Sequence, residues 1–284
     1  MRRALVTGGT KDDVAPIAVF IKNIKETNSH LFDEIVVYHD GIKTKDQELI
    51  KSIYNTRFIE YTYKPKSKND EVISYFSRMV YCKYECFALL DDYDEVVWSD
   101  YDVVVQDRLD EFCSIKDDEF NILTSGDVLR NFLYKDIINK EILEYDLDLA
   151  GVSTPLFALS SKLKDYDKIY KWCYEKTTAW GDDFYLPEQC IFSMAVQEFG
   201  IKTKRFEFDD YACFPTKSKG GEKIIHAAGP VKFWNGMNND TWNRLYNEWL
   251  KIGGTGYSDL KKRMKRKLLF VYTRLQGIRY KEHG

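Results

Sequence analysis

The sequence predicts an α/β fold with a mostly parallel, mixed sheet flanked by helices. Short apolar segments typical of buried strands alternate with segments in which apolar residues recur at helical spacing. No internal repeat or low-complexity linker divides the chain, and its 284 residues suffice for one large domain with a buried core. We therefore expect an α/β domain at residues 1–250 and a basic helical tail at residues 251–284.

The expected elements follow one another from the N-terminus. Those of the first part of the chain are strands at residues 4–7, 34–41, 57–63 and 95–105, and helices at residues 14–24, 46–54 and 70–90. The pattern then loosens, and the elements expected there are strands at residues 121–124 and 156–159 and helices at residues 160–176 and 186–199. Pro187 suits the first position of the last helix, because that position needs no backbone N–H.

Several classes of protein are disfavoured by the sequence. The six cysteines show neither a Cys-x-x-Cys pair nor zinc-site spacing, so we expect reduced thiols that fill the core. The N-terminal MRRALVTGG lacks the apolar run of a signal peptide, which predicts a cytoplasmic protein. The segment VTGGT resembles a dinucleotide-binding loop, but the residues that follow lack the further glycine of that fingerprint. A nicotinamide enzyme is therefore disfavoured.

The strongest strand signal, EVVWSDYDVVV at residues 95–105, contains Asp100 and Asp102. Positions i and i+2 of a strand face the same way, so both carboxylates would project together at the end of this strand. Ligand sites in open α/β sheets lie at such ends. Neighbouring carboxylates repel each other, and a divalent cation removes this repulsion and can bridge a diphosphate. The pair therefore predicts a metal site, with a solvated acidic turn as the alternative.

A second segment, KIIHAAGPVKFW at residues 223–234, combines a strand-like start with a histidine and small residues. Gly229 allows a ligand to approach the backbone closely, and Lys232 offers a point positive charge suited to phosphate. Trp234 could form an apolar wall against a sugar ring. His226 is a candidate ligand within this loop, and a structural histidine is the alternative.

Together these two segments resemble glycosyltransferase family 8, which includes glycogenin-like enzymes and bacterial lipopolysaccharide or capsule galactosyl- and glucosyltransferases. The family shows an Asp-x-Asp at the end of an apolar strand and a His-x-x-Gly-x-x-Lys-x-Trp block near the C-terminus, and both occur here in that order. The segment FSRMVYCKY is similar to the family's Tyr-x-Arg helix, which would place Arg78 near the donor. The resemblance covers roughly residues 3–240.

The resemblance implies a GT-A fold, a UDP-sugar donor and a bound Mn²⁺, or alternatively Mg²⁺. The metal ligands that it implies are Asp100, Asp102 and His226. The residues that it implies at the donor, besides Arg78 and Asp100, are Thr7, Gly8, Tyr101, Ser153, Thr154, Gly229 and Lys232. The residues expected at the acceptor are Trp180, Asp182 and Trp234, with an exposed loop as the alternative for Trp180 and Asp182.

Two positions depart from the family pattern. The family's Asn-x-Gly at a strand start reads Ser153-Thr154-Pro155 here, so a hydroxyl replaces an amide. The family's Asp-Gln at the start of a late helix reads Glu188-Gln189. Family 8 enzymes retain the anomeric configuration, so Glu188 is a candidate nucleophile. We favour a front-side displacement in which the departing phosphate takes the acceptor proton and Gln189 positions the sugar. A helix-start charge is the alternative for Glu188.

The C-terminal tail carries a charge opposite to that of the body. Residues 261–284 hold nine Lys or Arg and one acid, Glu282, giving +8, so the rest of the −3 chain carries −11. A basic amphipathic helix suits an anionic membrane surface, whereas the acidic body would repel nucleic acid. A solvated or partner-docking tail is the alternative.

We therefore predict an enzyme bound peripherally to the inner face of the cell membrane. It would transfer galactose or glucose to an oligosaccharide or lipid-linked glycan of the capsule or lipopolysaccharide type. The alternative is a catalytically silent module of the same fold that binds nucleotide sugars or glycans.

Overall fold

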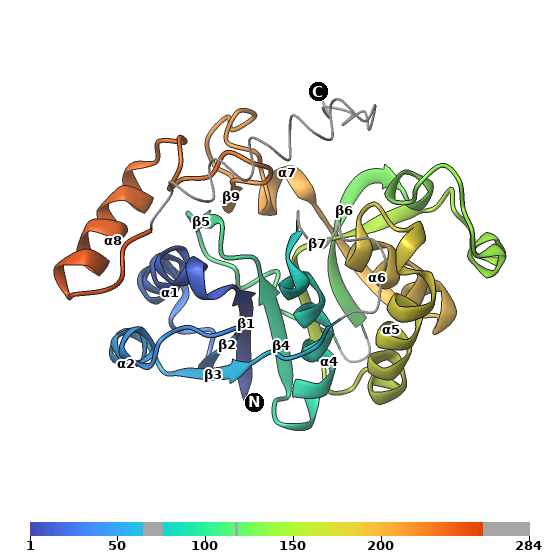
Figure 1. The fold of residues 1–284 in the computed structure, drawn as a ribbon, viewed down its shortest axis with the longest axis horizontal. Coiled ribbons are helices and arrows are strands. Elements are labelled where there is room, and N and C mark those ends of the chain that lie inside the picture. The colour runs from blue at the N-terminus through green and yellow to red at the C-terminus, as the bar shows by residue number, and fades with distance from the viewer. Residues whose placement is uncertain (65–75, 117–118, 258–284) are drawn as a thin grey trace.

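The computed structural model describes residues 1–64, 76–116 and 119–257, and its centre is a seven-stranded sheet (Figure 1). In spatial order the strands are β3 (Thr56–Glu60), β2 (Glu34–His39), β1 (Arg3–Gly9), β4 (Glu95–Ser99), β7 (Ala150–Ser160), β6 (Glu119–Val128) and β8 (Lys202–Glu207). Strands β3, β2, β1 and β4 run parallel, as do β6 and β8, whereas β7 is antiparallel to both of its neighbours. The sheet is therefore mixed, as the sequence predicts.

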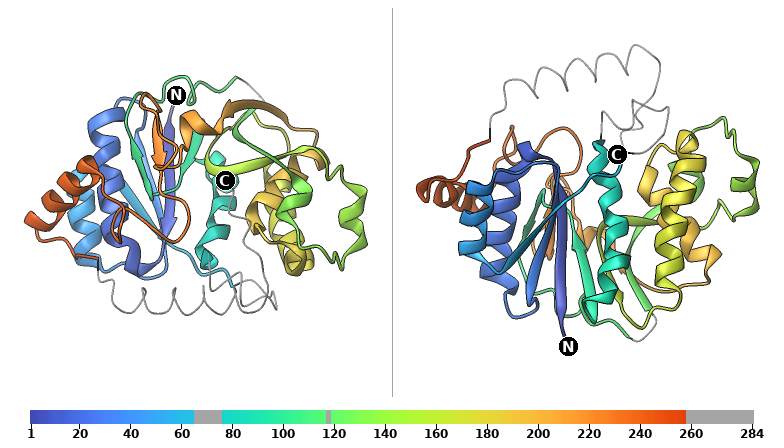
Figure 2. Two further views of the ribbon diagram at one scale, coloured as in Figure 1. Left: turned by 90° about the horizontal axis from the view of Figure 1, so that it is seen from above. Right: turned by 60° about the horizontal axis from the view of Figure 1, so that its bottom comes forward.

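Helices cover both faces of this sheet (Figures 1 and 2). The helices of one face are α1 (Val14–Asn28) and α2 (Thr44–Ile53), and those of the other are α4 (Glu85–Ala88), α5 (Tyr166–Trp180) and α6 (Pro187–Glu198). Successive residues of β1 alternate between the two cores: Ala4 and Val6 pack with α4, α5 and α6, while Leu5 packs with α1. Burial on both faces explains why the central strands read as continuous apolar runs.

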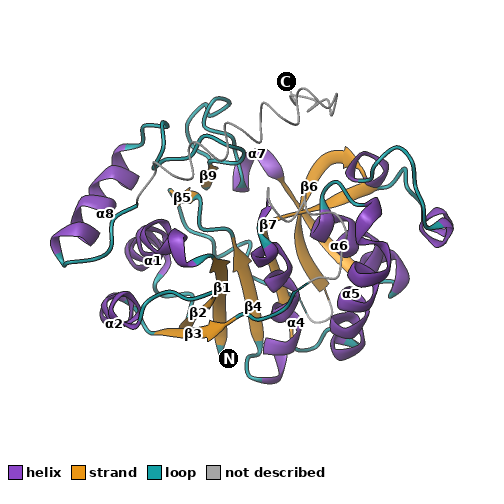
Figure 3. Ribbon diagram, in the orientation of Figure 1, coloured by secondary structure: helices purple, strands orange, loops and turns teal. Residues whose placement is uncertain are grey.

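A second, two-stranded antiparallel sheet lies beyond the C-terminal ends of β1 and β4 (Figure 3). Its strands are β5 (Val103–Val105) and β9 (Ile224–His226). The last described helix, α8 (Asp240–Lys251), packs Trp242 and Leu245 against Val19 of α1. The remaining short elements are α7 (Phe208–Tyr211) and the 3₁₀ helices η1 (Lys11–Asp13), η2 (Arg78–Tyr84), η3 (Leu89–Asp91), η4 (Leu129–Phe132), η5 (Lys140–Glu144) and η6 (Gly181–Asp183).

Two predicted elements are wrong in form. The strand expected at residues 95–105 is two strands, because β4 pairs within the large sheet and β5 pairs with β9. The helix expected at residues 70–90 is mostly 3₁₀ where it is described, as η2, α4 and η3, and residues 70–75 lie outside the described part. The four residues 81–84 are all buried, so η2 lacks the solvent face of an amphipathic α-helix.

Other boundaries differ more modestly. The helix expected at residues 160–176 begins at Tyr166, because β7 extends to Ser160. Strand β8 and helix α8 were not predicted. All six cysteines are free and buried, which confirms their expected role in the core. None of the helices in the described residues combines the length and hydropathy that crossing a bilayer requires. The tail from residue 258 lies outside the described part, so the division at residue 250 stays a prediction.

Candidate functional site

The two aspartates lie where the chain leaves one sheet and enters the other. The backbone N–H of Asp100 donates to the carbonyl of Pro155 on β7, at 2.8 Å, at the end of β4. Three residues later Val103 of β5 lies opposite His226 of β9, and the carbonyl of Asp102 accepts from the N–H of Ala227 at 2.9 Å. The short β5–β9 ladder therefore brings the histidine to the aspartates.

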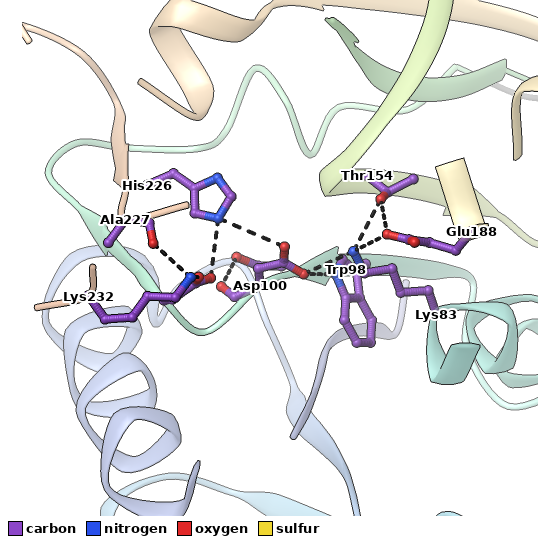
Figure 4. Close-up of polar contacts among 10 residues, drawn as sticks. Lys83, Trp98, Asp100, Thr154, Glu188, His226, Ala227 and Lys232 are labelled. Carbon is purple, nitrogen blue, oxygen red and sulfur yellow. Dashed lines mark hydrogen bonds and ion pairs between the residues drawn. The ribbon is translucent and has the colours of Figure 1, made fainter. Parts of the chain in front are cut away.

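Asp100, Asp102 and His226 converge on one point. Figure 4 shows the contact between Asp100 and His226. His226 Nε2 lies 3.2 Å from Asp102 Oδ1 and 3.9 Å from Asp100 Oδ2. One side-chain ligand atom from each of the three residues lies within 4.8 Å of the others. Two carboxylate oxygens and an imidazole nitrogen suit Mn²⁺, and the oxygens also suit Mg²⁺. The residues implied as metal ligands are thus brought together in a geometry that fits such an ion.

Two lysines flank this cluster on opposite sides (Figure 4). Lys83 Nζ lies 3.2 Å from Asp100 Oδ1 and 3.0 Å from Glu188 Oε1, and it donates to Thr154 Oγ1 at 3.1 Å. Lys232 Nζ donates to Asp102 Oδ2 and to the carbonyl of Ala227, the latter at 2.8 Å. Each aspartate is therefore paired with one ammonium group.

Burial and these charges act together on the pKa values of the site. Burial raises the pKa of the Asp100 carboxyl, although the Lys83 ammonium opposes this shift. Burial acts in the same direction on Asp102, but Lys232 and His226 outweigh it and hold the pKa of Asp102 well below its ordinary value. Burial lowers the pKa of Lys83, yet Asp100 and Glu188 outweigh that effect and raise it above the ordinary value. Lys83 is therefore positively charged at neutral pH.

Glu188 lies in the first turn of α6, but the residue is only 4% exposed and its carboxylate is turned toward Lys83. Its Oε1 accepts hydrogen bonds from Lys83 Nζ and, at 2.8 Å, from Thr154 Oγ1. Glu188 is therefore a first-turn helix charge, as the alternative holds, and it is also a buried partner of Lys83. Gln189 is half-buried, and its backbone carbonyl accepts a hydrogen bond from Ser193 Oγ at 2.7 Å.

Lys83 is a residue of the candidate site that the sequence prediction missed. Arg78, which was expected near the donor, begins η2 and is half-buried, whereas Lys83 near the end of the same 3₁₀ helix reaches Asp100. The available signal was a single lysine within the run Tyr81-Cys82-Lys83-Tyr84, since a charge enclosed by apolar neighbours needs a buried partner. No pattern in the sequence shows which partner it takes.

The predicted donor residues on the central strands are buried. Thr7 is fully buried, and its Oγ1 has no hydrogen-bond partner among the described residues. A Cβ on Gly8 would stand 2.4 Å from Cys82 Sγ, so glycine at this position lets η2 pack onto β1. Ser153 is also buried and pairs in register with Leu123. Of Ser153 and Thr154, it is Thr154 that contacts Lys83 and Glu188.

The aromatic residues predicted near the ligands have different surroundings. Tyr101 stacks on Trp234, with ring centroids 6.1 Å apart, and this pair lies in the segments that carry the aspartates and Lys232. Gly229, in the same loop as Lys232, has a φ of +87° and open space around the position of a Cβ.

The remaining acceptor candidates lie at the end of α5 and in η6. Trp180 is 2% exposed and packs edge-on against Trp172 and Tyr145, so its ring has little free surface for an acceptor. Asp182 of η6 is half-buried. The next residue, Asp183, is fully buried and accepts hydrogen bonds from the backbone of residues 138 and 139.

Comparison with known proteins identifies this arrangement. The fold is the GT-A fold of glycosyltransferases. A family model described as glycosyl transferase family 8 matches residues 4–198, and the chain belongs to this family. No curated protein sequence is significantly similar to the chain.

Solved structures of glycosyltransferases share the fold. The galactosyltransferase LgtC, in complex with donor and acceptor sugar analogues, is 15% identical with a TM-score of 0.64, and the match covers 87% of this chain and 99% of that chain. The apo structure of the bifunctional glycosyltransferase WbbM is 14% identical with a TM-score of 0.62, covering 86% and 49%. GlyE of Streptococcus pneumoniae TIGR4 is 14% identical with a TM-score of 0.57, covering 91% and 66%.

Replacing Lys83 by Met should destabilise the protein by about 3–5 kcal/mol, because Asp100 and Glu188 would lose their buried counter-charge. Urea unfolding at neutral pH measures the change. Since the pKa of Lys83 is raised on folding, its stabilising contribution is complete at neutral pH and is lost only as the pH rises through that raised value.

Two further variants separate the charge effect from a general packing defect. The double variant Lys83→Met/Glu188→Gln should recover part of the lost stability, because one unpaired carboxylate is removed with the ammonium. Lys168→Met, at an exposed pair with Asp165, should leave the unfolding curve unchanged. Equal unfolding midpoints for Lys83→Met and the wild type would contradict a charge-balancing role.

Proposed function

We propose that the protein is a metal-dependent, retaining hexosyltransferase that moves galactose or glucose from a UDP-sugar to a glycan acceptor. The observation that carries this proposal is the convergence of Asp100, Asp102 and His226 beside the Lys232 ammonium. Carboxylates and an imidazole suit a divalent ion, and a lysine at the same place suits the phosphates of a nucleotide sugar.

The chain's own residues would bind and orient the donor. A bound Mn²⁺ or Mg²⁺ would supply Lewis-acid stabilisation of the negative charge on the leaving diphosphate. Lys232 would contact the diphosphate and Gly229 would allow its close approach, while Thr7, Gly8 and Arg78 would lie at the nucleotide. Lys83 and Trp98 Nε1 both donate to Asp100 Oδ1, which leaves Oδ2 on the side of His226. This arrangement presets the carboxylate before a ligand arrives.

The environment of Glu188 favours a front-side displacement over a covalent intermediate. A nucleophilic carboxylate attacks the anomeric carbon with its negative charge, and Glu188 Oε1 accepts two hydrogen bonds that draw on this charge, one of them from an ammonium. Both bonds lower the nucleophilicity of that carboxylate. In the proposed reaction the departing phosphate takes the acceptor proton, and Gln189 positions the sugar with Tyr101, Ser153 and Thr154.

Two observations support the choice of hexose and acceptor. The structurally similar LgtC is a galactosyltransferase crystallised with donor and acceptor sugar analogues. The basic tail supports a lipid-linked or surface-glycan acceptor and a peripheral place on the cytoplasmic side of a membrane. Trp234, stacked on Tyr101, and Asp182 are the proposed acceptor contacts of this chain. The buried Trp180 would contribute to the acceptor site through packing.

Asp100→Asn or Asp102→Asn should reduce hexose transfer by about 100-fold or more, because each removes an anionic metal ligand. Both should also weaken UDP binding in the presence of Mn²⁺. The assay measures UDP released with several UDP-hexoses, which also identifies the donor. Asp107→Asn is the matched control, since Asp107 follows β5 but pairs with Lys223 at the surface. Wild-type turnover in both variants would contradict the proposed role of Asp100 and Asp102 as metal ligands.

Deletion of residues 261–284 should leave transfer to soluble acceptors intact and lower binding to anionic vesicles. Each Lys or Arg near such a surface contributes about 1 kcal/mol, and the segment holds nine of them. Vesicle sedimentation compares the full chain and the truncated chain on anionic and zwitterionic lipids. Equal sedimentation of both proteins with anionic vesicles would reject the membrane role of the tail.

A catalytically silent binding module is the second candidate, and the substitution of Ser153-Thr154-Pro155 in the donor region favours it. Incubation of the wild type with Mn²⁺ and a UDP-hexose, without acceptor, separates the two functions. A transferase should release UDP slowly by transfer to water, and Asp100→Asn should release none. A silent module would bind the nucleotide sugar and release no UDP in either form.

A further inference from the structure

The Lys232 ammonium occupies a position that the proposed ion would need. Lys232 Nζ donates to Asp102 Oδ2, while Asp102 Oδ1 faces His226 Nε2 at 3.2 Å. The side chains of Lys232 and Asp102 are both 14% exposed, so little water screens their attraction. Both oxygens of Asp102 are therefore engaged in the ligand-free protein.

Each aspartate of the cluster has an ammonium partner without any ion. Asp100 is paired with Lys83, which it shares with Glu188, and Asp102 is paired with Lys232. A divalent cation that enters this arrangement is repelled by the Lys232 ammonium on its own ligand, which weakens its attraction to the aspartates. Strong ion binding therefore requires one of the lysines to leave.

The two lysines differ in their freedom to leave. The Lys83 side chain is 6% exposed and is held by Glu188 and Thr154 as well as by Asp100. Within the described part of the chain, the Lys232 ammonium has one further contact, to the carbonyl of Ala227. A diphosphate offers Lys232 a stronger anionic partner than a single carboxylate does.

We propose that Lys232 is an exchangeable counter-ion of Asp102, which moves to the diphosphate when the nucleotide binds and so opens Asp102 Oδ2 to the ion. The inference rests on the proposed function and adds a coupling to it. Nucleotide binding removes the Lys232 ammonium from the ion site. Ion binding in turn displaces the same ammonium from Asp102 and makes it available to the nucleotide. Each ligand therefore raises the affinity of the other by the same factor.

The Lys232→Met variant tests this coupling, because its affinities for Mn²⁺ and for UDP should change in opposite directions. Without Lys232, nucleotide-free protein should bind Mn²⁺ about 10-fold more tightly, because the competing ammonium is gone. The same variant should bind UDP more weakly in the absence of metal, because a phosphate contact is lost. A general structural defect would weaken both bindings. Electron paramagnetic resonance of free Mn²⁺ and calorimetry with UDP measure them.

Matched variants control for charge and for folding. Lys223→Met removes a lysine that pairs with Asp107 Oδ2 at 2.6 Å, next to the start of β9, and should change neither affinity. Lys232→Arg keeps the positive charge and should keep Mn²⁺ binding to the nucleotide-free protein weak. Thermal unfolding of all variants verifies that they are folded.

Two results would overturn the inference, and only the second would also overturn the proposed function. If the wild type binds UDP and Mn²⁺ and transfers hexose, but Lys232→Met gains no Mn²⁺ affinity, the exchange is wrong and the proposed function stands. If the wild type binds neither UDP nor Mn²⁺, the proposed function fails together with the inference.

Discussion

The buried ammonium of Lys83 is the interaction on which the site depends. It joins Asp100 at the end of β4, Thr154 in β7 and Glu188 in α6, three segments that are distant in sequence. A buried charge is costly unless opposite charges and hydrogen bonds compensate it, and here the compensation exists only when these segments are packed together. The orientation of the Asp100 carboxylate is thus fixed by the packing of η2 between the sheet and α6.

Around this fixed centre the outer half of the site is built from a different part of the fold. His226 and Lys232 arrive through β9 and the loop that follows it, and β9 is held by pairing with β5. The large sheet therefore provides a rigid, enclosed side with Lys83, and the small sheet provides a side with the histidine and a more loosely held lysine. Such a division suits a site that must keep its ligands in place and still admit a large anionic substrate.

The sequence was sufficient for the parts of this arrangement that follow from local pattern. The apolar runs and helical periodicity predicted the alternating elements, and the spacing of Asp100 and Asp102 predicted that they act together. The break between β4 and β5 was not predictable, because it arises from pairing with β7 on one side and with β9 on the other. Lys83 was missed for a similar reason: local pattern cannot show which way a residue of an enclosed 3₁₀ segment points.

The pairing of β5 with β9 also has a consequence for how the protein matures. Asp100 and Asp102 leave the ribosome long before His226, which is more than a hundred residues further along the chain. Contacts between such distant segments form late, since the intervening chain must first be ordered. A newly made chain therefore carries a repelling pair of acids at an unfinished sheet edge until its C-terminal strand docks. Docking of β9 completes both the small sheet and the candidate site.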